Sequence, residues 1–274
     1  MKADVLRGMQ ALTQRTWSHD SSCHIGDLAW QRLMHVGRED EWSTRLWEVD
    51  GEVRAWGWSQ APGDLQLYVD PAHPELADEV LVHFGPKTVT TLDRATHVLD
   101  ALRRNGYVRS DGPYLAYLTR ALTGLPEPML PKGFTVRSVT ADDLVHRVAV
   151  HQAAWPATRV NEQSYRAVTA AWPYRAGLDW VVVAPDGSFA ASCLVWFDEA
   201  NGVGLLEPVG TDARFRRLGL GRSVCLAALR ALRAEGAREA VVYPVAGDSR
   251  HPAALPLYEA LGFAPYARSV DYLR

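Results

Sequence analysis

A segment rich in glycine and arginine, residues 209–223, contains the residue types that bind a phosphate group. Residues 216–221 within it read Arg-Arg-Leu-Gly-Leu-Gly, which is the pattern R-x-x-G-x-G. Glycines let the backbone approach a ligand closely, and the free N–H groups at the start of a following helix favour an anion. Arg216, Arg217 and Arg222 add the positive charge that a pyrophosphate needs. The segment predicts a phosphate-binding loop, and the alternative is a tight turn between a strand and a helix.

Two common nucleotide-binding motifs do not fit this segment. A Walker loop ends in Gly-Lys-Ser or Gly-Lys-Thr, and the segment has no such ending. A Rossmann fingerprint has the order G-x-G-x-x-G and opens a βαβ unit, whereas the strand before this loop is predicted to follow antiparallel hairpins. The pattern therefore indicates another phosphate-binding fold.

Glu207 is a carboxylate in an otherwise apolar strand, within the sequence Leu-Leu-Glu-Pro-Val at residues 205–209. Burying a charge is costly unless the charge is paired, so an acid at this place needs a reason. One interpretation is a catalytic base. The other is a solvated or salt-bridged residue on an outward face of the strand, and both stay open at this point.

Strands and helices that could position these residues alternate after residue 133. Strands are predicted at 134–139, 180–184, 188–197, 203–210 and 239–245 and in the tail through 272; helices are predicted at 140–155, 161–172 and 218–235, with a short one that ends near 261. Asn201-Gly202 predicts a hairpin turn. The order β-α-α-β-β-β-α-β-α-β predicts an α/β fold, a mixed α+β sheet with helices on its faces.

The first half repeats this order in a degraded form. Residues 47–58 are predicted to form a hairpin like the one at 180–197, and residues 65–69 match the strand before the loop. In place of the loop, residues 70–77 contain two prolines, two acids and no glycine. Proline removes N–H donors and carboxylates repel phosphate, so this half is predicted to lack a phosphate site.

A segment with three prolines and two glycines separates the two halves. We therefore expect a degenerate domain at residues 1–122, a linker at 123–133 and a domain with the intact loop at 134–274.

Composition narrows the class of protein. The chain has 274 residues, of which 47% are hydrophobic and 22% charged, as in an ordinary globular protein. The net charge of −3 argues against a nucleic-acid partner, and the N-terminus lacks the apolar core of a signal peptide or membrane span. Cys23, Cys193 and Cys225 lie far apart and the histidines are dispersed, so neither disulfides nor a metal site is expected. We expect a cytoplasmic monomer or homodimer without a membrane partner.

The loop, the helix and strand after it, and the run Ala-Leu-Pro-Leu-Tyr-Glu-Ala-Leu-Gly-Phe at residues 254–263 resemble the GNAT N-acetyltransferases. The resemblance covers residues 134–274, and the layout is similar to that of tandem proteins such as mycothiol synthase. It implies two tandem GNAT-like domains, each a mostly antiparallel mixed sheet flanked by helices. It also implies an enzyme that uses acetyl-CoA and no metal to acetylate a primary amine of a small molecule by direct transfer.

The resemblance further implies how the cofactor is held. Backbone N–H groups of residues 218–222 would hold the CoA pyrophosphate, and the backbone of Val209 and Thr211 would pair with pantetheine as an added strand does. The residues implied to bind the cofactor are Val209, Thr211, Arg216, Arg217, Leu218, Gly219, Leu220, Gly221, Arg222 and Ser223.

Two residues stand where the family carries its catalytic groups. Tyr258, five residues before Phe263, has the place of the general acid, and a phenol with a pKa of about 10 suits protonation of a thiolate. The alternative is a core aromatic residue. Glu207 lies in the strand that often carries the base. In the first half Leu102 takes the place of Tyr258 and cannot donate a proton.

Two positions depart from the family pattern. His251 stands where many members have asparagine, and Pro256 lies inside the expected helix. A helix that begins near Ala254 would place the proline in its first turn, whereas an earlier start would kink the helix and displace Tyr258. Candidate residues for binding the acceptor are Trp155, Trp172, Tyr174 and His251.

Two alternatives to a small-molecule acetyltransferase follow from the same residues. One is an acyl-CoA-binding protein without catalysis, for which the altered residues His251 and Pro256 leave room. The other is an N-acetyltransferase of protein termini or lysines. Tyr258 and Glu207 favour an enzyme.

Overall fold

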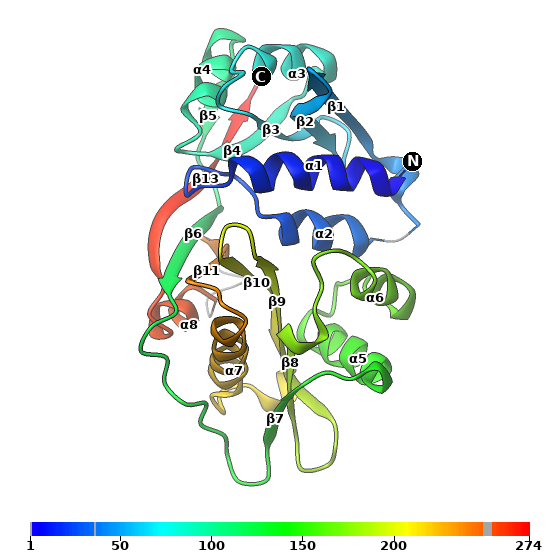
Figure 1. The fold of residues 1–274 in the computed structure, drawn as a ribbon, viewed down its shortest axis with the longest axis vertical. Helices are drawn as coiled ribbons and strands as arrows, with labels where there is room; N and C mark the ends of the chain where they lie inside the picture. The colour runs from blue at the N-terminus through cyan, green and yellow to red at the C-terminus, as the bar shows by residue number, and fades with distance from the viewer. Residues whose placement is uncertain (1, 36, 249–253) are drawn as a thin grey trace.

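The computed structural model describes residues 2–35, 37–248 and 254–274 (Figure 1). The elements of the first half are α1 (Lys2–Thr16), α2 (Ile25–Leu33), β1 (Ser43–Val49), β2 (Glu52–Ser59), β3 (Asp64–Val69), α3 (Leu76–Phe84), β4 (Thr88–Leu92), α4 (Thr96–Arg104), β5 (Val108–Ser110) and β6 (Tyr114–Ala121). Those of the second half are β7 (Thr135–Ser138), α5 (Leu144–Ala154), α6 (Glu162–Thr169), β8 (Asp179–Val183), β9 (Phe189–Asp198), β10 (Val203–Thr211), α7 (Leu220–Ala234), β11 (Glu239–Val242), β12 (Val245–Ala246), α8 (Ala254–Ala260) and β13 (Ala264–Leu273).

The second half confirms the predicted order of strands and helices. The Asn-Gly pair turns the chain between β9 and β10, where Gly202 has a φ of 67° that suits glycine. The first half repeats the arrangement from β1 to α4, again with a hairpin, a third strand, a helix, a parallel strand and a short helix. The helices α1 and α2 at the start of the chain were not part of the predicted repeat.

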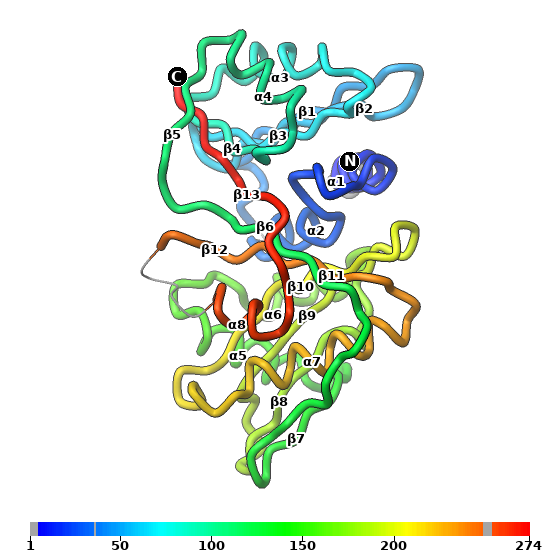
Figure 2. Tube along the Cα trace, turned by 90° about the vertical axis from the view of Figure 1, so that its left-hand side faces the viewer, coloured from blue at the N-terminus to red at the C-terminus, as the bar shows by residue number. Residues whose placement is uncertain are grey.

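The strands join one mixed sheet in the order β1-β2-β3-β4-β13-β6-β11-β10-β9-β8-β7, with β12 beside β6 and β5 beside β13. The last strand of each half crosses to the other half. β6 pairs with β11, while β13 pairs with β6 along its first part and with β4 along its second part. Both views show β13 running from one half into the other (Figures 1 and 2). Residues 122–134 divide the sequence and contain no helix or strand, but the sheet continues across that division.

Helices cover both faces of the sheet in the second half. Every residue of β9 is buried, because α7 packs on one face of the strand while α5 and α2 pack on the other. The three cysteines are buried free thiols. The buried apolar residues that α2 shares with α6, β9 and β10 are Ala29, Trp30, Tyr165, Val168, Trp196 and Leu205.

Helix α2 therefore belongs to the first half by sequence and to the second half by packing. In Figure 1, α1 and α2 lie between the two halves. Gly26 at the start of α2 touches the sheet so closely that an added Cβ would lie 2.0 Å from the Cβ of Trp196. Only a residue without a side chain fits this contact.

The substitution Gly26→Ala tests this contact. Alanine favours a helix over glycine, but the added carbon collides with Trp196, and overpacking of this kind costs about 1–3 kcal/mol. We expect a lower free energy of unfolding in urea than for the unsubstituted protein. Gly112→Ala is the matched control, because no atom lies within 4 Å of its added carbon and its φ is not positive. Equal free energies for Gly26→Ala and the unsubstituted protein would show that α2 does not pack as described.

Candidate active site

The site begins where β10 and β11 part. The two strands pair in parallel only between Val203–Leu205 and Glu239–Val241. Strand β10 then continues to Thr211 and stays paired with β9 on its other edge. The edge of β10 beyond Leu205 that faces β11 is left without a strand partner among the residues described.

Two residues on this free edge turn their backbone groups toward the opening. The N–H of Asp212 donates to the carbonyl oxygen of Ala190 in the direction of β9, at 3.0 Å. Because successive residues of a strand face opposite sides, Val209 and Thr211 face away from β9. An unpaired edge of this kind is a template for an extended ligand with amide groups.

The loop after β10 exposes N–H groups at the start of α7. Arg217 and Gly219 have φ values of 68° and 77°, which turn the backbone sharply just before the helix. No side chain of the described residues caps the helix at Gly219. The N–H groups of the first turn therefore lack a protein acceptor and lie at the positive end of the helix dipole, as in an anion-binding site.

Other predicted residues of the loop support this geometry. An added Cβ on Gly221 would lie 3.2 Å from the hydroxyl of Thr211, so the glycine lets the helix close on the strand. The guanidinium of Arg216 lies 3.5 Å from the carbonyl oxygens of Thr211 and Ala154. The Ser223 hydroxyl donates to the carbonyls of Met129 and Gly219. The remaining predicted residues differ in exposure: Leu218 is exposed, Arg222 is half-buried and Leu220 is buried in the core.

The corresponding place in the first half has the same opening but no free donors. Strands β3 and β4 pair over three residues, from Asp64 to Gln66, and then part. The N–H groups of Leu76, Ala77 and Asp78 donate to the carbonyls three residues before them, at 3.1, 3.2 and 3.2 Å. Because these donors are used inside the protein, α3 does not offer the row of N–H groups that α7 offers.

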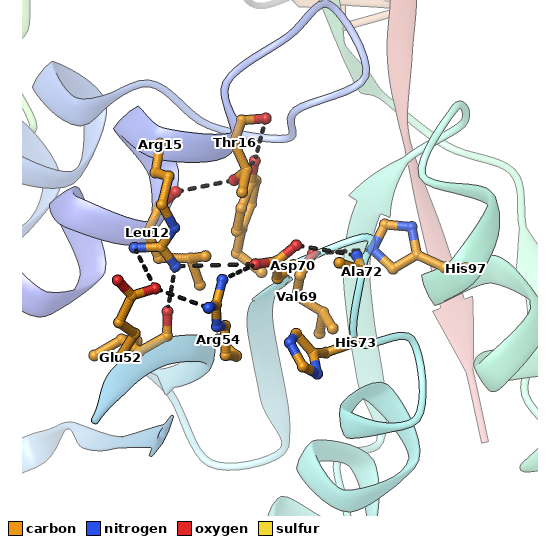
Figure 3. Close-up of polar contacts among 12 residues, drawn as sticks. Leu12, Arg15, Thr16, Glu52, Arg54, Val69, Asp70, Ala72, His73 and His97 are labelled. Carbon is orange, nitrogen blue, oxygen red and sulfur yellow. Dashed lines mark hydrogen bonds and ion pairs between the residues drawn. The ribbon is translucent and has the colours of Figure 1, made fainter. Parts of the chain in front are cut away.

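Side chains also line the first-half opening (Figure 3). Asp70 accepts from Arg54 and from the N–H of Ala72, both at 3.0 Å. His97 Nε2 lies 3.0 Å from the carbonyl oxygen of Val69, on the strand edge that in β10 is free. The carbonyl group of Val69 is thus engaged by a side chain, and the Asp70 carboxylate is ion-paired with Arg54 and Arg15.

Glu207 lies at a β-bulge in β10, where the register with β9 shifts between Leu206 and Val209. Its half-buried carboxyl group is within hydrogen-bonding reach of the carboxyl group of Asp27, and Gln31 Nε2 donates to its Oε1 at 3.4 Å. Burial raises the pKa of Glu207 well above its ordinary value, and the Asp27 charge raises it further. No lysine, arginine or histidine in the described parts of the chain forms an ion pair with it.

Tyr258 lies in α8 on the other side of the opening. Its buried ring packs edge-on against Phe263, with ring centres 5.8 Å apart. Burial raises the pKa of the Tyr258 phenol, and the nearby groups of Cys225, Cys193 and Glu207 raise it further, so the phenol keeps its proton at neutral pH. Helix α8 is described from Ala254, so Pro256 lies in its first described turn, where proline is tolerated.

Two of the candidate acceptor residues, Trp172 and Tyr174, line one cavity, whereas Trp155 does not line it. Trp155 lies beside the free strand, since an added Cβ on Gly210 would be 3.2 Å from its Nε1. Trp172 stacks under Arg7, with 3.9 Å from the guanidinium carbon to the ring centre. The Tyr174 hydroxyl donates to Asp179 at 3.4 Å. His251 lies outside the described residues.

Three residues at the site were missed in the sequence. Asp27 and Gln31 come from the first half, and their spacing of four places them on one face of α2. That spacing was the only available signal, and it does not indicate which surface the helix covers. Gly210 could have been found, because a glycine inside a strand often marks a close approach of other atoms.

The residues that the structure describes offer neither a metal cluster nor a membrane-spanning helix. Across residues 2–35, 37–248 and 254–274, no group of three or more histidine, cysteine, aspartate or glutamate side chains could hold a metal ion. Within the same residues, no helix has the length and apolar character needed to cross a membrane.

Comparison with known proteins adds a family and a fold. Residues 147–263 match the acetyltransferase (GNAT) family, while no curated protein sequence matches the chain. A GCN5-related N-acetyltransferase from Sphaerobacter thermophilus superposes with a TM-score of 0.63 and 18% identity, over 99% of this chain and 91% of that one. A tandem GNAT protein from the clavulanic acid biosynthesis pathway has a TM-score of 0.61 and 15% identity, over 99% and 94% of the two chains. A GNAT-family acetyltransferase from Colwellia psychrerythraea has a TM-score of 0.62 and 16% identity, over 98% and 96%.

The matched segment begins within α5 and ends at Phe263, three residues after α8, and so includes the strand opening, the loop and Tyr258. The structural neighbours cover both halves, and one of them is itself a tandem protein. Residues 147–263 therefore match the acetyltransferase (GNAT) family, and nearly the whole chain has the fold of GNAT proteins, a tandem protein among them.

Proposed function

We propose that the protein is an acetyl-CoA-dependent N-acetyltransferase that acts on a primary amine of a small molecule by direct transfer. The observation that carries this proposal is the parting of β10 and β11 after Leu205, which leaves a strand edge free. Glu207 lies in β10 at the point of parting, and Tyr258 has a pKa that responds to the Glu207 charge. These observations support a binding edge, a candidate acid and a candidate base at one opening.

The residues present fit acetyl-CoA. The amide groups of pantetheine match the free backbone groups of Val209 and Thr211, and a pyrophosphate matches the uncapped first turn of α7. The exposed Arg216 and Arg217 stand at the same loop. When bound, acetyl-CoA supplies an activated acyl group as a thioester.

The two candidate catalytic residues would move protons in opposite directions. An amine attacks only in its neutral form, so a base must take a proton from the ammonium, and Glu207 lies in β10 where the strands part. Its raised pKa brings its basicity closer to neutral pH, where a general base is most effective. Tyr258, which keeps its proton, would give that proton to the sulfur of the departing thiolate.

The proposal also covers the entry of the acceptor and the setting in which the protein works. The acceptor would enter beside Trp155, the candidate acceptor residue that lies against the free strand. We also propose that the protein works in the cytoplasm as a monomer or homodimer, without a nucleic-acid or membrane partner.

The loop predicts one cofactor site per chain, and Gly219→Ala tests it. A residue with a side chain resists the φ of 77°, so the loop should relax and turn its N–H groups away. We expect calorimetry to give a stoichiometry near one for the unsubstituted protein and an affinity about tenfold lower for Gly219→Ala. Gly236→Ala is the matched control, because it adds the same strain at the other end of α7, with a φ of 99°. Equal affinities in the two variants, or two equivalent sites, would contradict the assignment.

Replacing Tyr258 by phenylalanine removes only the hydroxyl group. The ring contact with Phe263 remains, so folding and acetyl-CoA affinity should be unchanged. For a general acid we expect a rate loss on the order of 10²- to 10⁴-fold in steady-state kinetics. Turnover near that of the unsubstituted protein would mean that another group protonates the thiolate.

The substitution Glu207→Gln tests whether Glu207 is the general base. Both proteins are assayed with the same weakly basic amine, whose own pKa lies below the apparent pKa of the enzyme. The unsubstituted protein should show kcat/KM rising with pH, because Glu207 accepts a proton only after it has lost its own. The substitution should remove this rising limb and lower the rate about 10²- to 10⁴-fold.

A protein that binds acetyl-CoA but acetylates no amine in a broad panel would be an acyl-CoA-binding protein instead.

A further inference from the structure

Helix α2 brings two polar side chains of the first half to the base of the second half. Ala29 and Trp30 of this helix are buried with Trp196 and Leu205, and Gly26 touches Trp196 directly. On the same helix, Asp27 and Gln31 both contact Glu207. The catalytic strand therefore meets a part of the chain that lies far outside the matched family segment.

The contact between Asp27 and Glu207 joins two acids without a counter-ion. Both side chains are half-buried, and no ion pair to either of them is present in the parts of the chain that the structure describes. Two interacting carboxyl groups without a counter-ion cannot both be ionised at low cost, so the pair is expected to hold one proton near neutral pH. Burial raises the pKa of Asp27 to about 6, although the hydrogen bonds from Glu207 and Gln31 oppose this rise.

The groups that surround this pair are neutral. Cys23 lies before α2, Tyr117 lies in β6, Tyr243 follows β11 and Tyr258 lies in α8. Burial raises the pKa of each of these four groups, so all of them keep their protons near neutral pH. The pair thus carries a single negative charge in a surrounding of neutral groups, which favours a cationic ligand.

Three tyrosine side chains lie close together where the two halves of the chain meet. The Tyr117 ring stacks on Tyr243 at 4.1 Å between ring centres, and Tyr266 of β13 lies 6.1 Å from Tyr117. The Tyr117 hydroxyl donates to the carbonyl of Ser22 at 2.6 Å. The buried hydroxyl groups of Tyr243 and Tyr266 interact with each other and have no other hydrogen-bond partner in the described structure.

We propose that Asp27 and Glu207 act as one proton-accepting pair, oriented by Gln31, so that α2 of the first half completes the active site for an amine that enters as a cation. The inference rests on the proposed function, because it assigns a positioning role to Asp27 through the base Glu207. It gives the degenerate half a part in catalysis.

The ammonium of the acceptor gives one proton to the singly protonated pair, which leaves the amine neutral and both carboxyl groups protonated. The amine nitrogen then bonds to the acyl carbon, the C–S bond breaks, and Tyr258 gives its proton to the sulfur. The nitrogen loses a second proton, which restores the phenol, and the pair releases one proton to solvent. Ammonium and thioester thus become amide, thiol and one free proton.

The pair is tested first without any measurement of activity. In protein with ¹³C-labelled aspartate and glutamate carboxyl carbons, the Asp27 and Glu207 signals are assigned by their loss in Asp27→Asn and Glu207→Gln. In Asp27→Asn, the pKa of Glu207 should fall by about one unit or more, because the like charge is gone. In Glu207→Gln, the pKa of Asp27 should change as well, because the coupling is reciprocal, and this second variant keeps the test valid if the first does not fold.

Asp20→Asn is the matched control, since Asp20 is an exposed acid of the same N-terminal region that pairs with Arg94 at 2.6 Å. It should leave the Glu207 titration unchanged. If the Glu207 signal titrates alike in the unsubstituted protein and in Asp27→Asn, the pair does not exist and the inference is wrong.

The pH dependence of kcat/KM then separates a positioning role from a merely structural one. In the unsubstituted protein the rising limb should follow the first ionisation of the pair, whereas in Asp27→Asn it should follow the Glu207 carboxyl signal instead, and Asp20→Asn should keep it in place. If the rising limb of kcat/KM stays in place in Asp27→Asn while the rate falls, Asp27 has a structural role only. If the unsubstituted protein acetylates no amine, the proposed function fails, whereas the ¹³C titration still decides whether the pair exists.

Discussion

The separation of β10 from β11 after three paired residues is the constraint on which the rest of the structure depends. A strand edge without a partner would be a liability unless something covers it. Here the loop of glycines and arginines ends the free edge, and Tyr258 and Glu207 border it. The first half opens in the same way between β3 and β4. The difference between the halves therefore lies in what occupies the opening, and His97 and Asp70 occupy it in the first half.

Exchange of the last strands explains why two unequal halves stay together. β6 completes the sheet beside β11, and β13 connects β6 with β4, so neither half has a complete sheet of its own. The packing of α2 on β9 and β10 follows from the same arrangement and places Asp27 beside Glu207. The first half, whose α3 offers no row of free N–H groups, can thus remain necessary, because it supplies strands and side chains to the other half.

Much of this structure could be predicted from the sequence where the signals were local. The alternation of strands and helices, the turn at Asn201-Gly202 and the loop before α7 each depend on residues within a short window, and all appear in the structure. The strand exchange could not be predicted, because a strand's pattern shows which face is buried and not which strand lies beside it. Asp27 was missed for a related reason: its partner is far away in the sequence.

Amide hydrogen exchange tests the central claim most directly, because that claim concerns backbone groups that are free in one half and used in the other. On saturation with acetyl-CoA, exchange should slow at Val209, at Thr211 and at residues 218–222, where the N–H groups lack protein acceptors. Residues 70–79 should exchange as before, since the donors of Leu76, Ala77 and Asp78 are already bonded. Slower exchange at residues 70–79, or no change at residues 209–222 in protein that binds acetyl-CoA, would contradict the account.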